Sequence, residues 1–195
     1  MDFFNKHKSI SFPIAALVAL IFVELLWQYD LFDRRMALAL TAILGGLIYL
    51  TIYFIISKKF KIILPAFTAW IIFLTVFLDA MGNFLHYYGT LGWWDDFTHF
   101  VGTAAIAIIM LSILYLLNIN KIIKIGKFGL VLFTYAISIF LASFYEVTEY
   151  WGDLITESRR IGDRYDTVSD LSWNLLGVTL VIILSFIFFR KKKIR

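Results

Sequence analysis

The side chains that can do chemistry in this chain are carboxylates and imidazoles, and they gather at the ends of apolar segments. Asp79, Asn83 and His86 are spaced i, i+4, i+7, so a helix would place them on one face. Further along, His99 follows Asp95 by four residues, which again puts two polar side chains on one helical face. The chain has no cysteine, so thiolate metal sites and thiol nucleophiles are excluded.

Two more apolar segments carry acids at their ends. Glu146 and Glu149 close one of them with i, i+3 spacing, and Asp166, Asp170 and Asn174 open the last with i, i+4, i+8 spacing. If these helix ends lie on one side of a membrane, their polar faces can converge. Converging carboxylates repel strongly in a low dielectric, so they need protons, a bound cation or arginine partners. A hard divalent ion with oxygen ligands and one or two imidazoles fits this set of side chains.

We therefore predict a divalent-metal site, with the identity of the metal left open. An alternative for some of the acids is that they cap helix N-termini, where free N–H groups and the helix dipole favour carboxylates; it applies to Asp95, Asp96 and Asp166. Capping does not exclude ligation. The base in a reaction would be Glu149 or His99. The predicted ligands are Asp79, Asp95, His99, Glu146, Glu149, Asp166 and Asp170, with Asn83, His86, Asp96 and Asn174 in supporting positions.

The elements that must position these groups are membrane helices. Hydrophobic residues make up 61% of the 195 residues and charged residues 16%, whereas a soluble domain carries about 25% charged residues. A bilayer core needs roughly 20 apolar residues of helix. The sequence therefore predicts an all-α bundle of six transmembrane helices, forming one integral membrane domain over residues 1–195. The predicted spans are 10–29, 36–56, 62–86, 95–117, 128–150 and 166–189.

The charges sort to opposite sides of this predicted bundle. Most of the 18 Lys and Arg residues lie at the N-terminus, at the C-terminus and in the two connections that share their side, so both termini are predicted to be cytoplasmic. Nearly all of the 14 acids, and most of the tryptophans, fall toward the other side. We expect a plasma (inner) membrane protein whose acidic cluster is extracytoplasmic. Because the basic residues stand in short clusters between apolar runs, nucleic acid is not an expected partner, whereas membrane lipids are.

Five arginines lie on the acidic side, against the general bias, and three of them belong to one loop. Arginine forks match phosphate geometry, so Arg159, Arg160 and Arg164 are candidates to hold a lipid headgroup. The alternative is pairing with acids of the same loop, namely Asp153, Glu157 and Asp163.

Polar and small residues inside the spans raise two further expectations. Glu24 lies about three-quarters of the way along the first span, where it would either join the acidic cluster or face another polar neighbour. Small residues allow membrane helices to approach closely, and we expect this at Gly45, Gly46, Gly102 and Gly177.

The combined motifs resemble those of the uncharacterised YjdF-like inner-membrane proteins, over roughly residues 70–180. The resemblance implies an inner-membrane location and a small helical bundle, and it implies no activity. The residues that carry it are Asp79 with Gly82-Asn83, Trp94-Asp95 with His99 and Gly102, Glu146 with Glu149, and the series Gly162-Asp163, Asp166-Thr167, Asp170 and Asn174.

Three functions remain open from the sequence. The first is a metal-dependent enzyme, a hydrolase or transferase, acting on a lipid or lipid-linked substrate at the outer leaflet. The second is a cation- or proton-coupled transporter or binding protein, since carboxylates and histidines inside membranes are typical of ion pathways. The third is a structural accessory subunit in which the acids only hold the helices together. A site confined to one face favours chemistry over conduction, because a pathway needs polar groups at mid-depth.

Overall fold

The structure is a computed structural model that describes residues 3–26, 32–156, 162 and 164–191. All regular structure in these residues is helical, and six of the helices are long and apolar enough to cross a membrane, which confirms the prediction of an all-α protein with six spans. Residues 27–29 of the predicted first span lie outside the described part. The helices are α1 (Phe3–Leu26), α2 (Phe32–Phe60), α3 (Ala66–Phe84), α4 (Tyr87–Thr90), α5 (Trp94–Ile119), α6 (Lys127–Thr156) and α7 (Arg164–Lys191).

The outward faces of the long helices are apolar. Phe12 is 71% exposed, Phe140 65% and Ile183 55%, and many other large apolar side chains are exposed as well. A water-facing surface rarely carries so much contiguous apolar area, whereas lipid requires it. Multi-pass insertion, with lipid around these helices, follows from the spans. Trp93 and Trp151 are exposed, as an interfacial belt demands, but Trp94 is buried and so belongs to the interior.

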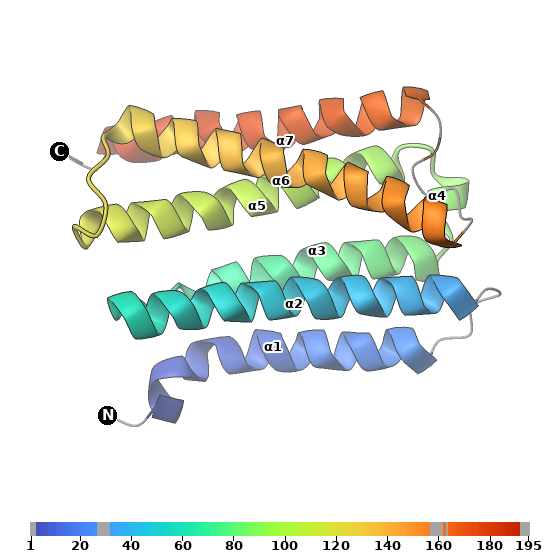
Figure 1. Ribbon diagram of the computed structural model, residues 1–195, viewed down its shortest axis with the longest axis horizontal. Helices are drawn as coiled ribbons and strands as arrows, with labels where there is room; N and C mark the ends of the chain where they lie inside the picture. The colour runs from blue at the N-terminus through green and yellow to red at the C-terminus, as the bar shows by residue number, and fades with distance from the viewer. Residues whose placement is uncertain (1–2, 27–31, 157–161, 163, 192–195) are drawn as a thin grey trace. The chain divides into compact units, whose positions relative to one another are not determined.

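The chain divides into two compact units, residues 1–92 and 93–195, and the prediction of a single domain stays a prediction. In the first unit α1, α2 and α3 pack against one another and alternate in direction (Figure 1). Two polar pairs, one buried and one partly buried, accompany this packing. The Tyr49 hydroxyl lies 2.9 Å from the Thr68 hydroxyl, which links α2 to α3, and His7 Nδ1 lies 2.8 Å from the Tyr53 hydroxyl, which links α1 to α2.

In the second unit α5, α6 and α7 also pack pairwise and alternate in direction (Figure 1). The start of α5, the end of α6 and the start of α7 consequently share one end of this unit. Its core consists of small and branched apolar residues contributed by all three helices, namely Ala107, Leu130, Val131, Val178, Val181 and Ile182.

The third span differs from its predicted bounds of 62–86. It begins at Ala66 because Pro65 has an extended backbone (φ −60°, ψ 145°). It ends at Phe84, after which His86 adopts a left-handed conformation (φ 55°, ψ 28°) at the entrance to α4. The helical face predicted for Asp79, Asn83 and His86 is therefore wrong for His86, whose side chain is exposed. The other long helices overlap their predicted spans.

Close helix approach occurs at two of the four glycines for which it was expected. A Cβ atom on Gly177 of α7 would overlap the Phe100 carbonyl oxygen of α5 and lie 3.2 Å from the Ala104 nitrogen. On Gly46, a Cβ would lie 2.9 Å from a methyl group of Leu17. The expectation is wrong for Gly45 and Gly102, where a Cβ would contact nothing in the described chain.

We expect Gly177→Ala to destabilise the protein by about 1–3 kcal/mol, the usual cost of forcing a methyl group into a packed contact. The contact here is with backbone, which cannot rotate away. Gly102→Ala is the matched control: it is also a helical glycine, but it has open space and should be neutral or slightly stabilising. Thermal unfolding of both variants in detergent measures the difference, and equal midpoints would contradict the close approach.

Candidate metal centre

The first turn of α5 sets up the site. Trp93 stands at the N-cap position without a side-chain cap, and Asp95 and Asp96 lie inside the first turn. Neither acid occupies the N-cap position itself, but both lie in the first turn, where the helix dipole and the free N–H groups favour carboxylates, as the capping alternative expected. The Thr98 hydroxyl donates to the Asp95 carbonyl oxygen at 2.8 Å and closes the turn. His99 follows Asp95 by one turn.

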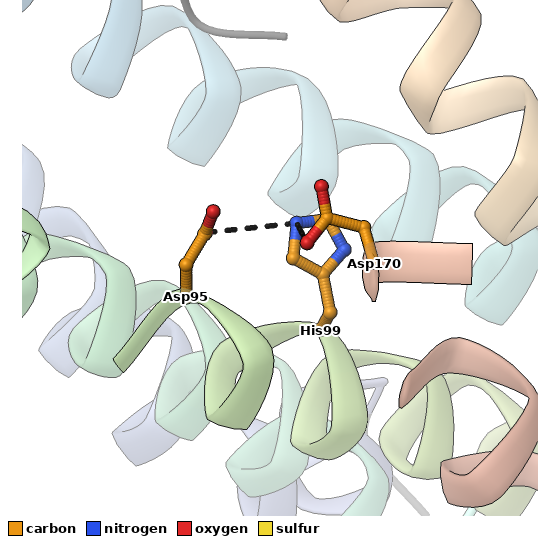
Figure 2. Close-up of side chains that lie close together, drawn as sticks. All are labelled: Asp95, His99 and Asp170. Carbon is orange, nitrogen blue, oxygen red and sulfur yellow. Dashed lines mark ion pairs between the residues drawn. The ribbon is translucent and has the colours of Figure 1, made fainter. Parts of the chain in front are cut away.

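The imidazole of His99 has carboxylates at both of its nitrogens. Nε2 lies 3.7 Å from Asp95 Oδ1 and 3.6 Å from Asp170 Oδ1, and Figure 2 shows both carboxylates beside the ring. Nδ1 lies 3.3 Å from Glu146 Oε1. The His99 side chain is only 10% exposed. One imidazole thus joins carboxylates from α5, α6 and α7.

Two sets of ligand atoms lie close enough together to hold a metal ion. Asp95, His99 and Asp170 form one set, and His99, Glu146 and Glu149 form the other, with the atoms of each set within 4.8 Å of one another. The structure thus brings together five of the seven predicted ligands inside one unit. Oxygen and imidazole donors are suited to Mn²⁺, Fe²⁺ and Zn²⁺.

The charges in this cluster are poorly compensated. Both oxygens of Glu146 and Oδ1 of Asp170 are buried and receive no hydrogen bond from the described residues, although His99 lies within ion-pair distance of both carboxylates. In the described part of the chain, neither carboxylate pairs with a Lys or Arg. Burying a carboxylate without a partner is costly, so this geometry needs protons or a cation.

Hydrogen bonds between α5 and α7 hold the two sides of the site together. The Thr103 hydroxyl donates to Asn174 Oδ1, one turn deeper than His99 on α5 and one turn deeper than Asp170 on α7. At the mouth, the Ser169 hydroxyl donates to Asp96 Oδ1 at 2.6 Å. Asp96 and Asn174 therefore have supporting partners on the neighbouring helix. The sequence analysis missed Thr103 and Ser169. The only feature of the sequence that could have indicated them is that Thr103 is close in sequence to His99 and Ser169 is close to Asp170.

The remaining predicted ligands lie in different places. Asp166 precedes Asp170 by one turn on α7 and interacts electrostatically with Glu146 and Asp170. It also packs against Gly162, which has a left-handed backbone (φ 64°) and where a Cβ would overlap the Asp166 carboxyl. Asp79 belongs to the first unit, where Asn83 and Tyr88 donate hydrogen bonds to its Oδ1 at 3.3 and 2.9 Å.

Of the three arginines, only Arg164 lies in the described part of the chain. Its Nη2 donates to the Tyr165 hydroxyl at 2.9 Å, and its guanidinium carbon lies 4.8 Å from the centre of the Tyr165 ring. The side chain is exposed at the start of α7. Arg159 and Arg160, and the expected acidic partners Glu157 and Asp163, lie outside the described residues.

The family model described as "Predicted membrane protein (DUF2238)" matches residues 12–191. The chain belongs to this family. The finding agrees with the resemblance to YjdF-like proteins and with a polytopic membrane protein, and it assigns no activity. Comparison with curated proteins gave no match, and comparison with solved structures gave none either.

Because the Glu146 carboxylate faces other acids, we expect Glu146→Gln to raise the stability of the metal-free protein by about 1 kcal/mol, since a neutral amide removes the repulsion. The measurement is thermal unfolding in detergent with excess chelator. Asp153→Asn, also on α6 but outside both ligand sets, is the control and should change the midpoint less. A lower midpoint for Glu146→Gln would argue against uncompensated charge.

Proposed function

We propose that the α5–α7 unit binds a divalent metal ion at His99 and that the protein is a metal-dependent enzyme acting on a lipid or lipid-linked substrate at the outer leaflet. One observation carries the proposal: the carboxylates of Asp95, Glu146 and Asp170 surround one largely buried imidazole, and no described cation balances Glu146 or Asp170. One divalent ion would neutralise this cluster without requiring several of its acids to be protonated.

The two ring nitrogens of His99 favour different roles. On the Nε2 side, Asp95 and Asp170 come from different helices and can bind an ion together with the ring. On the Nδ1 side, Glu146 is placed to accept the Nδ1–H hydrogen bond, which fixes the tautomer and the orientation of the ring. Three protein ligands leave coordination positions for water or substrate. The Asp95 side chain is 40% exposed, so this side is the accessible one.

The chemistry follows from the same arrangement. When bound, a divalent ion polarises a substrate oxygen and activates water. Glu149 lies one turn after Glu146 and close to His99, so it is the carboxylate available to accept a proton from an attacking water or hydroxyl. An ion that polarises the substrate and a carboxylate that accepts a proton are compatible with hydrolysis, in which water attacks. They are equally compatible with group transfer, in which the hydroxyl of an acceptor alcohol attacks.

The position of the site favours a substrate from the membrane interface. It lies at one end of three membrane-spanning helices, where the exposed Trp93 and Trp151 suit the headgroup level. Arg164, at the start of α7, can offer its guanidinium to a phosphate. Arg159 and Arg160 belong to the same proposed headgroup site. The outer-leaflet assignment depends on the distribution of Lys and Arg in the sequence.

Elemental analysis of detergent-purified protein tests the metal centre. We expect near-stoichiometric transition metal in the native chain, and its loss in both His99→Ala and Asp170→Asn. His86→Ala is the matched control, because His86 is exposed in a turn of the other unit and should leave the metal content unchanged. The proposal is contradicted if the folded native protein contains no metal after loading with Mn²⁺, Fe²⁺ or Zn²⁺.

Glu149→Gln tests the enzymatic role separately. Loss of a general base typically lowers kcat by about 10²- to 10⁴-fold, so turnover of radiolabelled phospholipids or lipid-linked phosphates by the metal-loaded protein should fall by this factor. The metal content should remain high, because the Nε2-side ligands are intact. If the metal-loaded native protein turns over no lipid in such a panel, the enzyme assignment fails while the metal centre stands.

A cation or proton carrier is the second candidate, and one observation favours it. The hydroxyls of Thr134 and Ser138 on α6 are fully buried and receive no hydrogen-bond partner among the described residues. With Ala142 they form a line of small residues that leads, turn by turn, from Glu146 toward the middle of the helix. The sequence analysis had described the polar site as confined to one face.

Ion flux into proteoliposomes decides between the two candidates. A carrier predicts cation or proton uptake that falls in both Glu146→Gln and Ser138→Ala. The enzyme predicts no flux in the native protein and little effect of Ser138→Ala on lipid turnover.

A further inference from the structure

A groove on the exposed face of α2 is separate from the site in α5–α7. It runs from Leu47 past Thr51 and Ile55 to Lys58 and Lys59, and its volume is about 630 Å³. All residues that line it belong to α2, so it lies within the first unit. They recur at spacings of three and four residues, which places them on one helical face. Ligand pockets commonly have volumes of about 300–1,000 Å³, so the groove is large enough to hold part of a lipid.

The length of the groove matches one leaflet of a bilayer. A helix rises by about 1.5 Å per residue, so Leu47 and Lys59 are about 18 Å apart along the axis of α2. Half of the hydrocarbon core of a bilayer measures about 15 Å. Leu47 is 55% exposed and Ile55 53%, whereas the last turn of the helix carries Lys58 and Lys59. The Lys59 ammonium lies 5.3 Å from the centre of the Phe60 ring, which keeps it at the end of the helix. The groove is therefore apolar along the leaflet and positively charged at the membrane interface.

The positive charge at this end of the first unit is not balanced by acids. Neither lysine of the groove forms an ion pair with an acid in the described part of the chain. The hydrogen bond between His7 and Tyr53 places the start of α1 beside the end of α2, where the exposed Lys8 adds a further positive charge. Residues 3–10 and 55–66, which make up this end, contain no acid. The C-terminus of a helix carries only about half a negative charge, so the two lysines of the groove still attract an anion.

We propose that this groove is a binding site for an anionic phospholipid, with one acyl chain along Leu47 and Ile55 and the phosphate at Lys58 and Lys59. Any lipid can cover the apolar part of the groove, but only a lipid with a net negative charge also balances the lysines. Each lysine near a membrane surface strengthens the binding of anionic lipid by about fivefold. The distribution of Lys and Arg in the sequence predicts that this end faces the cytoplasm, so the lipid would belong to the inner leaflet. The site is thus distinct from the one proposed at His99.

Native mass spectrometry of the full-length protein in detergent tests this site, by titration with phosphatidylglycerol or with phosphatidylcholine of the same acyl chains. We expect the native chain to bind phosphatidylglycerol more tightly, by about fivefold or more. The double variant Lys58→Gln, Lys59→Gln should weaken phosphatidylglycerol binding by about 25-fold and leave phosphatidylcholine binding unchanged. The matched control is Lys121→Gln, Lys124→Gln, which removes two exposed lysines from the second unit and should leave both affinities unchanged.

Thr51→Phe tests the apolar part of the groove. Thr51 is exposed, so the variant is expected to fold, and the larger side chain fills the middle of the groove without touching the lysines. Phosphatidylglycerol binding should fall several-fold. The proposal is overturned if this variant binds phosphatidylglycerol as well as the native chain, or if the native chain binds the two lipids equally. Equal losses in the two lysine double variants would also overturn it, since overall charge would then attract the lipid. A dimer that Thr51→Phe dissociates, with lipid binding unchanged, would assign the groove to a second copy of the chain instead.

Discussion

A carboxylate enclosed by apolar helices has to be neutralised, and this constraint governs the arrangement of polar groups in both units. Water can stabilise a charge only where it can reach it, and the helix interiors offer mainly hydrocarbon. The buried carboxylates have different partners in the two units. In the second unit, Glu146 and Asp170 meet the ring of His99. In the first, Glu24 interacts electrostatically with Asp79, which accepts hydrogen bonds from Asn83 and Tyr88.

Close packing of α5 on α7 makes the His99 cluster possible. Gly177 lets the backbones approach at Phe100, and the bond from Thr103 to Asn174 joins the same pair of helices one turn deeper than His99. Such supports matter because a metal or catalytic geometry must be held to about half an ångström. A wider spacing of α5 and α7 would separate the Asp170 carboxylate from the Nε2 atom of the ring.

Much of the fold could be predicted from the sequence, because runs of about 20 apolar residues have few stable alternatives to a membrane helix. The residues at which the helices begin and end were predicted less accurately. Pro65 delays the start of α3, and the turn at His86 removes that residue from the expected helical face. Asp95 and Asp96 were allowed a capping role, but the helix starts two residues earlier than an N-cap at Asp95 would require and three earlier than one at Asp96. Helix ends inferred from such local signals are uncertain by one or two residues.

The sequence by itself determined the six apolar helices and the absence of thiol chemistry. It also determined the spacing that places Asp95 one helical turn before His99, and the concentration of acids at the helix ends. These follow from composition and from the 3.6-residue helical period. Only the tertiary structure decided which acids meet. It placed Glu146 and Asp170 at opposite nitrogens of one ring and packed α1, which carries Glu24, against α3, which carries Asp79. The reason is physical: a helical period fixes the face on which a side chain lies, whereas the neighbour of that face depends on packing between residues far apart in the chain.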